Sequence, residues 1–164
     1  MERHNILTVA WTGILSTRPP MTYISVRPER YSYGIIKDTG EFVMNLATEK
    51  LAFAADYCGV RSGRDIDKFA KMRLTPEPAS KISAPMIAES PLNIECEVRE
   101  IVNLGSHDMF VSEIVAVNVD ESAFNSAGKL DFIKCGLLAY AHGEYFTLGK
   151  RIGGFGFSVR KKRK

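Results

Sequence analysis

The sequence contains few cysteines and no long apolar run, and both features exclude classes of protein. Its cysteines, Cys58, Cys96 and Cys135, are odd in number and widely spaced, and no Cys-x-x-Cys pair occurs. This spacing argues against a disulfide framework and against a structural zinc site, and it favours the reducing cytoplasm. Apolar residues never run past five in a row, so the sequence predicts a soluble protein that does not enter membranes.

A large excess of charge of one sign is also missing from most of the chain. The net charge of +3 depends on five consecutive basic residues at 160–164, and the remainder carries 17 basic and 19 acidic side chains. A mildly acidic body does not favour nucleic acid as a partner. The length of 164 residues predicts one domain over 1–159, followed by a frayed basic tail over 160–164.

Familiar catalytic signatures are absent as well. The sequence has no Gly-x-Ser-x-Gly nucleophile elbow, no phosphate-binding Gly-Lys-Ser/Thr loop and no dinucleotide fingerprint after a first strand. The segment 142–144, His-Gly-Glu, matches half of a deaminase zinc signature, but the required Pro-Cys-x-x-Cys is missing. The sequence therefore predicts no metal site, and a bound cofactor would carry any reaction.

What the sequence does contain is mostly strand composition. β-branched and aromatic residues, or alternating apolar and polar residues, mark each predicted strand, and an extended loop over 16–20 joins the first two. A turn at 105–108 joins the two longest strands as an antiparallel pair. The predicted strands are 6–11, 23–26, 41–46, 92–99, 109–119, 137–141 and 145–146.

Two short helices are expected among these strands. Gly40 ends a helix predicted over 33–38, and Gly59 ends one predicted over 51–55. The proline-rich stretch 75–91 is predicted to be an extended connection over the surface. Strands at both ends of the chain with short helices between them predict a small, closed antiparallel barrel.

The polar stretch 58–69 has the composition of an anion site. Arg61, Arg64 and Lys68 supply cations, and two glycines let the backbone approach a ligand closely. A phosphate-bearing cofactor is one interpretation. The other is a solvated loop in which the arginines and two aspartates neutralise each other, and the composition of this segment alone does not decide between them.

Five blocks occur in an order that is typical of one family. They are NILTVAW (5–11), SVRP (25–28), GEFVMNL (40–46), SGRDIDKF (62–69) and GSHDMFV (105–111). On these blocks, and over nearly its whole length, the chain resembles the flavin reductase-like, FMN-binding split-barrel family, and within it the flavoredoxin type. The resemblance implies a mainly β fold with short inserted helices, namely a six-stranded antiparallel split β-barrel of Greek-key order. It also implies a homodimer that binds FMN non-covalently in a cleft near the dimer interface.

The resemblance further implies which residues contact the cofactor. FMN needs a flat slot for its ring and a cradle of cations and N–H groups for its phosphate. The implied residues are Thr8, Ala10, Trp11 and Thr12 at the ring, Ser25, Val26 and Arg27 where the second strand passes the cofactor, Arg27, Ser32 and Lys68 at the phosphate, and His107 and Tyr140 as further flavin contacts.

Several of these residues have ordinary structural alternatives. An aromatic residue in a strand, such as Trp11 or Tyr140, is usually part of the core. Ser32 can cap a helix, and that role can coexist with phosphate binding. Arg27 can form a surface ion pair, and a histidine in a turn, such as His107, is commonly just exposed.

The implied function is an FMN-binding oxidoreductase that transfers reducing equivalents from NAD(P)H to an acceptor. Hydride transfer from a nicotinamide needs two aligned rings rather than an acid–base pair, so no catalytic side chain is predicted. One alternative is a flavoredoxin-like electron carrier that exchanges electrons with a redox protein partner and has no nicotinamide site. Another is a split-barrel binding module that has lost its flavin.

Overall fold

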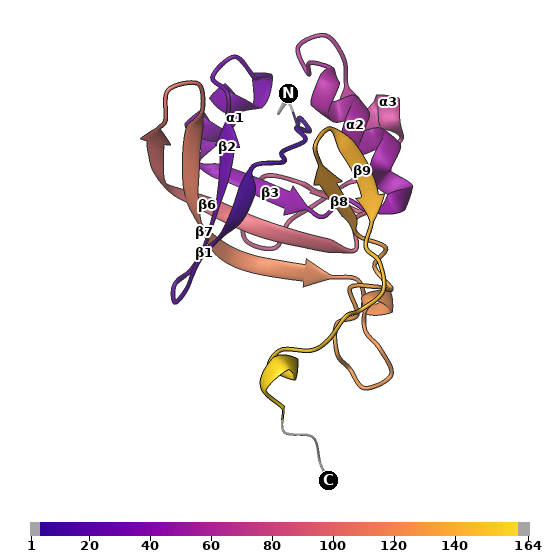
Figure 1. Cartoon of the computed structure of the whole chain (residues 1–164). Coiled ribbons are helices and arrows are strands. Elements are labelled where there is room, and N and C mark those ends of the chain that lie inside the picture. The colour runs from indigo at the N-terminus through magenta and orange to yellow at the C-terminus, as the bar shows by residue number, and fades with distance from the viewer. Residues whose placement is uncertain (1–3, 161–164) are drawn as a thin grey trace.

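The computed structural model describes residues 4–160, so most of the predicted basic tail lies outside the described residues. The strands are β1 (Thr12–Thr17), β2 (Pro20–Val26), β3 (Glu41–Asn45), β4 (Pro76–Glu77), β5 (Met86–Ile87), β6 (Leu92–Asn103), β7 (Asp108–Val119), β8 (Leu138–Ala141) and β9 (Glu144–Thr147), shown in Figure 1. The helices are α1 (Tyr31–Thr39), α2 (Ala52–Val60) and α3 (Lys68–Met72), with short 3-10 turns η1 (Glu49–Leu51), η2 (Glu121–Ala123) and η3 (Phe157–Val159). None of the described helices combines the length and the apolar character that crossing a membrane would require.

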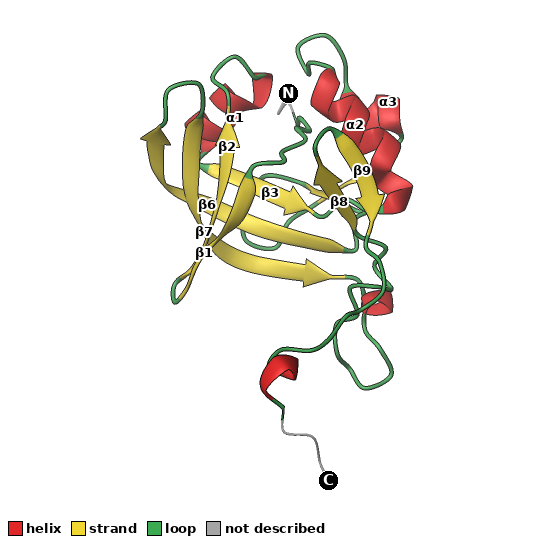
Figure 2. Cartoon of the chain, in the orientation of Figure 1, coloured by secondary structure: helices red, strands yellow, loops and turns green. Residues whose placement is uncertain are grey.

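An antiparallel sheet with the strand order β1-β2-β7-β6-β3 forms the framework of the molecule (Figure 2). The predicted pair of long strands is confirmed as the hairpin β6–β7, which forms the centre of this sheet. Strands β2, β7, β6 and β3 follow Greek-key order, because α1 lies between β2 and β3 in the chain and the chain crosses there to the far edge. The mainly β, antiparallel character predicted from the sequence is therefore confirmed.

Neither the closed barrel predicted from the strand pattern nor the six strands implied by the family resemblance is confirmed. The described part of the chain forms a five-stranded sheet whose edge strands, β1 and β3, do not pair with each other. The strands of the late hairpin β8–β9 pair only with each other. The hairpin meets the rest of the chain through a hydrogen bond from Leu138 N to the Ala47 oxygen (3.1 Å), one from Tyr145 Oη to Asp56 (3.2 Å) and the neighbouring bridge between Thr48 and Leu137. Local composition identifies an extended segment but not its partner, and for this reason the predicted closure failed.

The first predicted strand, 6–11, is extended but lies outside the sheet, and β1 begins only at Thr12. Apart from the Trp11 oxygen, which accepts from Ser25 N of β2, its bonded polar groups have helical partners: Lys68 Nζ donates to the Ile6 oxygen, and Thr8 Oγ1 donates to the Ala55 oxygen. The loop predicted over 16–20 is instead a tight hairpin in which Thr17 pairs with Pro20.

The two predicted helices form, with shifted ends. Gly40 ends α1 as predicted: it has φ of 70° and its N–H donates to the Ile36 oxygen. Arg30, not Ser32, is the cap residue at the start of α1. Helix α2 continues through Gly59 to Val60, and there the missing side chain permits close packing, since an added Cβ would lie 3.2 Å from Thr8 Cβ.

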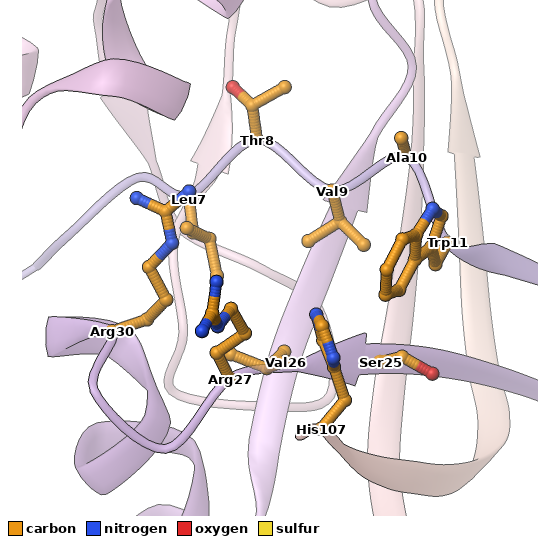
Figure 3. A pocket seen from close by; sticks show the side chains of 10 residues that line it. All are labelled: Leu7, Thr8, Val9, Ala10, Trp11, Ser25, Val26, Arg27, Arg30 and His107. Carbon is orange, nitrogen blue, oxygen red and sulfur yellow. The ribbon is translucent and has the colours of Figure 1, made fainter. Parts of the chain in front are cut away.

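The core packs α1 against the sheet. Val26 of β2, Phe42 of β3 and Phe110 of β7 are buried together with Ile36 of α1. Leu7 and Val9 of the extended segment pack against this cluster, while Thr8 and Ala10 point the opposite way (Figure 3). The core therefore fixes one face of the segment 7–10.

A buried carboxylate fastens the proline-rich connection 75–91 to the sheet. Glu95 of β6 is fully buried and accepts hydrogen bonds from Ser80 N (2.8 Å), Ser80 Oγ (2.8 Å), Lys81 N (2.7 Å) and Asn118 Nδ2 (2.7 Å). Burial by itself would raise the pKa of Glu95, but these hydrogen bonds to the charged form outweigh it and lower the pKa to about 2. The folded state therefore favours the ionised carboxylate strongly.

Candidate functional site

A pocket of about 180 Å³ lies between the segment 7–11, the end of β2 and the turn before β7 (Figure 3). Its lining includes most of the residues that the sequence predicted for a flavin site. The lining residues are Leu7, Thr8, Val9, Ala10, Trp11, Ser25, Val26, Arg27, Arg30 and His107.

One end of the pocket is aromatic. The rings of Trp11 and His107 lie 4.3 Å apart between centroids, with an interplanar angle of 48°. Trp11 is 58% exposed, so it is not the core aromatic residue that the alternative interpretation proposed. The turn that carries His107 is anchored by the next residue, Asp108, which accepts a hydrogen bond from Tyr33 Oη (2.5 Å). This end offers a fixed surface on which a flat ring can stack.

The other end of the pocket is cationic. Figure 3 shows the side chains of Arg27 and Arg30 beside Leu7, on the opposite side of His107 from Trp11. Arg30 Nη1 donates to the Gly59 oxygen (3.0 Å), and Arg30 is also the cap residue of α1, whose N-terminus adds partial positive charge. Arg27 forms an exposed ion pair with Glu29 (3.6 Å), which water screens. This end is suited to an anion.

Between the two ends, the segment 7–10 has backbone donors that no other described residue pairs. None of its N–H groups donates to an acceptor within the part of the chain that the structure describes. At the adjoining residue the chain is held to β2, because the Ser25 N–H donates to the Trp11 oxygen (3.0 Å). Backbone N–H groups require a partner when they are covered, so a ligand over this segment can accept hydrogen bonds from it.

Lys68 does not line the pocket, but it holds the segment that does. Its buried ammonium donates to the oxygens of Ile6 (2.7 Å) and Cys58 (2.7 Å). Burial lowers the pKa of Lys68, an effect that the Cys58 thiol opposes and that nearby Arg30 increases. Lys68 therefore joins the segment that lines the pocket to the C-terminal end of α2, and its charge adds to the positive end of the pocket.

The rest of the stretch 58–69 also fastens the segment 5–8. Gly63 lies so close to Asn5 that an added Cβ would meet the Asn5 Oδ1 atom at 2.0 Å. Asn5 Nδ2 in turn donates to the buried hydroxyl of Ser32 (2.7 Å), so Ser32 holds this segment and does not line the pocket. Arg64 lies over the Tyr31 ring, 6.0 Å from its centroid. In this structure the polar loop positions the wall of the pocket instead of lining it.

Substitution of Gly63 tests this close approach. Gly63→Ala should lower the free energy of unfolding by about 1 to 2 kcal/mol, because the new methyl group displaces Asn5 from Ser32. Gly34→Ala is the matched control: it lies within α1, nothing stands within 4 Å of its added Cβ, and it should be neutral or stabilising. Denaturant unfolding measures both, and equal effects of the two substitutions would contradict the packing described here.

Two further predicted residues lie outside the pocket. Thr12 is the first residue of β1, where its hydroxyl donates to the Tyr23 oxygen (2.6 Å). Tyr140 stands exposed on β8, with its ring 5.0 Å from that of Tyr145. The structure thus gives both residues local partners in hairpins.

Three lining residues were absent from the prediction. Leu7 and Val9 alternate with predicted residues in the block 5–11. Predicting every residue of that block as pocket lining would have included them. Arg30 was missed because the start of α1 was placed too late in the sequence. A basic residue next to a helix start is a recognisable anion-site signal once the helix is correctly placed.

Comparisons with known proteins identify the family. The family model of the flavin reductase like domain matches residues 1–149. Flavoredoxin of Desulfovibrio vulgaris (Miyazaki F) has a TM-score of 0.89 and 32% identity, over 95% of this chain and 85% of its own. A split barrel domain protein from Shewanella frigidimarina NCIMB 400 has a TM-score of 0.82 and 26% identity, over 93% and 78% of the two chains.

Among sequence relatives, an NADPH-flavin oxidoreductase of Streptomyces viridifaciens is 26% identical over 110 residues, which are 66% of this chain and 56% of that protein. The family match covers the whole pocket and the whole five-stranded sheet. The chain therefore belongs to the flavin reductase-like family of flavoproteins, and its antiparallel sheet is similar to that of a split-barrel neighbour.

Proposed function

We propose that this protein binds FMN non-covalently in the pocket and passes reducing equivalents from NAD(P)H through it to an acceptor. The observation that carries the proposal is the division of one pocket into an aromatic end and an arginine end, with unpaired backbone N–H groups between them. FMN has the same division, with a flat ring at one end and a phosphate at the other.

The residues present fit such a ligand. Trp11 and His107 would border the ring, and the N–H groups of 7–10 would bond to its polar edge. Arg27 and Arg30, at the N-terminus of α1, would bind the phosphate. Bound FMN supplies the redox chemistry by accepting a hydride, and the protein's residues bind and orient the reactants without an acid–base pair.

The pocket is smaller than the cofactor it is proposed to hold. Its volume of about 180 Å³ falls below the roughly 300 to 1,000 Å³ of sites that enclose a ligand of this size, and Trp11 remains exposed. We infer that a second copy of the chain covers the open side, so the functional unit is a homodimer.

A flavoredoxin-like electron carrier is the second candidate, favoured by the similarity to flavoredoxin of Desulfovibrio vulgaris. It would exchange electrons with a redox protein and have no nicotinamide site. Anaerobic addition of NADH or NADPH to the FMN-loaded protein separates the two candidates. Rapid loss of the flavin absorbance supports the reductase; no change with either nucleotide supports the carrier. Failure to bind FMN at all would contradict both.

Charge removal at the cationic end tests the placement of the phosphate. Arg27→Gln and Arg30→Gln should each weaken FMN binding about tenfold, the usual scale for a hydrogen bond to a charged group. Riboflavin, which lacks the phosphate, should bind both variants as it binds the native protein. Arg61→Gln, an exposed substitution away from the pocket, is the control. Flavin fluorescence titrations measure these affinities, and equal losses for both ligands would argue against a phosphate at this end.

We also infer that residues 1–159 act as a single domain and that the protein works in the cytoplasm. Cys58, Cys96 and Cys135 are buried and unpaired, as expected in a reducing compartment. Burial raises the pKa of all three thiols, so none is a ready nucleophile, and the redox chemistry is left to the flavin.

A further inference from the structure

After β9 the chain runs away from the sheets as an arm, residues 149–159 (Figure 1). The only hydrogen bonds of the arm within the described residues are internal, from Phe157 N to Gly154 O and from Val159 N to Gly156 O. Ile152, Phe155 and Val159 are 93%, 106% and 82% exposed. So many apolar side chains on one exposed segment indicate that the arm binds a surface.

A second hollow, of about 330 Å³, opens at the root of this arm. Four apolar residues line it, namely Phe132, Ile133, Leu137 and Leu148, and Phe132 and Ile133 are themselves about half exposed. Glu49 is the acidic residue in the lining, and it has no ion pair within the described part of the chain. The hollow thus presents apolar side chains beside polar atoms, together with one carboxylate that has no ion pair among the described residues.

We propose that the arm of one copy docks in this hollow of a second copy, with Phe155 as the anchor, so that two copies exchange arms. Leu148 both lines the hollow and precedes the arm, so a two-fold axis beside Leu148 brings each arm to the hollow of the other copy. The stretch from Leu148 to Phe155 can span up to about 25 Å, enough to cross such an interface.

The charges of the arm and of the hollow also favour the arm of a second copy as the occupant. Lys150, Arg151 and Arg160 flank the apolar residues of the arm, and Glu49 is available in the lining of the hollow. The chain before residue 160 carries a net negative charge, whereas the end of the arm leads into five basic residues. No residue of the arm lines the hollow of its own chain. The arm therefore complements the hollow in charge, and its apolar side chains can contact the four apolar residues of the lining.

Sedimentation of the full chain over a range of concentrations tests the docking. The native protein should be a dimer, and the double variant Ile152→Ser, Phe155→Ser should raise the dimer dissociation constant at least tenfold. Phe53→Ser removes an equally prominent side chain, 76% exposed, from α2 and is the matched control. Unchanged association of the arm variant, or a native protein that stays monomeric, would overturn the proposal.

A cysteine pair distinguishes exchange from docking within one chain. When the single variants Ile133→Cys and Phe155→Cys are mixed and oxidised, the proposal predicts a disulfide-linked species of twice the chain mass. A chain that carries both Ile133→Cys and Phe155→Cys would overturn the exchange if it formed only an internal disulfide.

The inference rests on the second copy proposed above, but not on the flavin. FMN titrations on the same variants distinguish failure of the docking from failure of the proposed function. A dimer that persists when the arm carries the two serines contradicts the docking alone. Loss of FMN binding in an intact dimer contradicts the proposed function alone.

Discussion

Replacement of Glu95 by glutamine should lower the free energy of unfolding at neutral pH by about 3 kcal/mol. The carboxylate accepts hydrogen bonds from two backbone N–H groups, at Ser80 and Lys81, and from two side chains. A glutamine amide would direct N–H groups toward some of these donors and leave buried groups unpaired. The estimate follows from the pKa, which falls from 4.5 to about 2 on folding.

The same pKa predicts how stability depends on pH. Because the pKa is lower in the folded state, the stabilisation by Glu95 is fully present above about pH 4.5 and is lost as the pH falls toward 2. Denaturant unfolding at several pH values should show this slope in the native protein and a weaker slope in Glu95→Gln.

Glu113→Gln is the matched control for Glu95. It lies on the neighbouring strand β7, and its carboxylate forms a partly exposed pair with Arg99 (2.8 Å). Exposed pairs contribute at most about 1 kcal/mol, so the loss should be small. Similar losses for the two variants would show that Glu95 is not the main fastening of the proline-rich connection.

Replacement of Lys68 by methionine should lower the free energy of unfolding by about 2 to 3 kcal/mol and weaken flavin binding about tenfold. The variant leaves the oxygens of Ile6 and Cys58 without their donor, and each unpaired buried group costs about 1 to 3 kcal/mol, partly offset because a charge no longer needs to be buried. The segment that lines the pocket then loses its attachment to α2.

Riboflavin distinguishes the two roles considered for Lys68. If Lys68 positions the pocket wall, Lys68→Met weakens the binding of riboflavin and of FMN by similar factors. If it contacts the phosphate, as the sequence predicted, FMN alone loses affinity. Lys71→Met, an exposed substitution on the same helix, should leave stability and both affinities unchanged.

The central hairpin and the position of the aromatic end could be predicted from the sequence. Alternating residues determine β6 and β7, and Gly40 ends α1 because its left-handed conformation suits a residue without a side chain. Trp11 and His107 were placed by family blocks, since neither residue has a local pattern that identifies a pocket. The local patterns therefore predicted the central strands and the end of α1, and the family blocks predicted the aromatic end.

The direction of long polar side chains could not be predicted. Lys68 looks like a surface cation in the sequence, yet its stem is buried and its ammonium bonds to carbonyls ten and sixty-two positions away in the chain. Likewise, the composition of 6–11 predicts an extended backbone but not that its partners are helices. Both failures concern contacts between residues far apart in sequence.

The attachment of the segment 7–10 at both ends affects the entropy of binding. Lys68 holds the carbonyl of Ile6 before it, and Ser25 holds that of Trp11 after it, so the free N–H groups between them are already ordered when a ligand arrives. Ordering a flexible segment during binding would subtract from affinity. In this protein folding has already restricted that segment, so contacts made along it can contribute to affinity with little further loss of chain entropy.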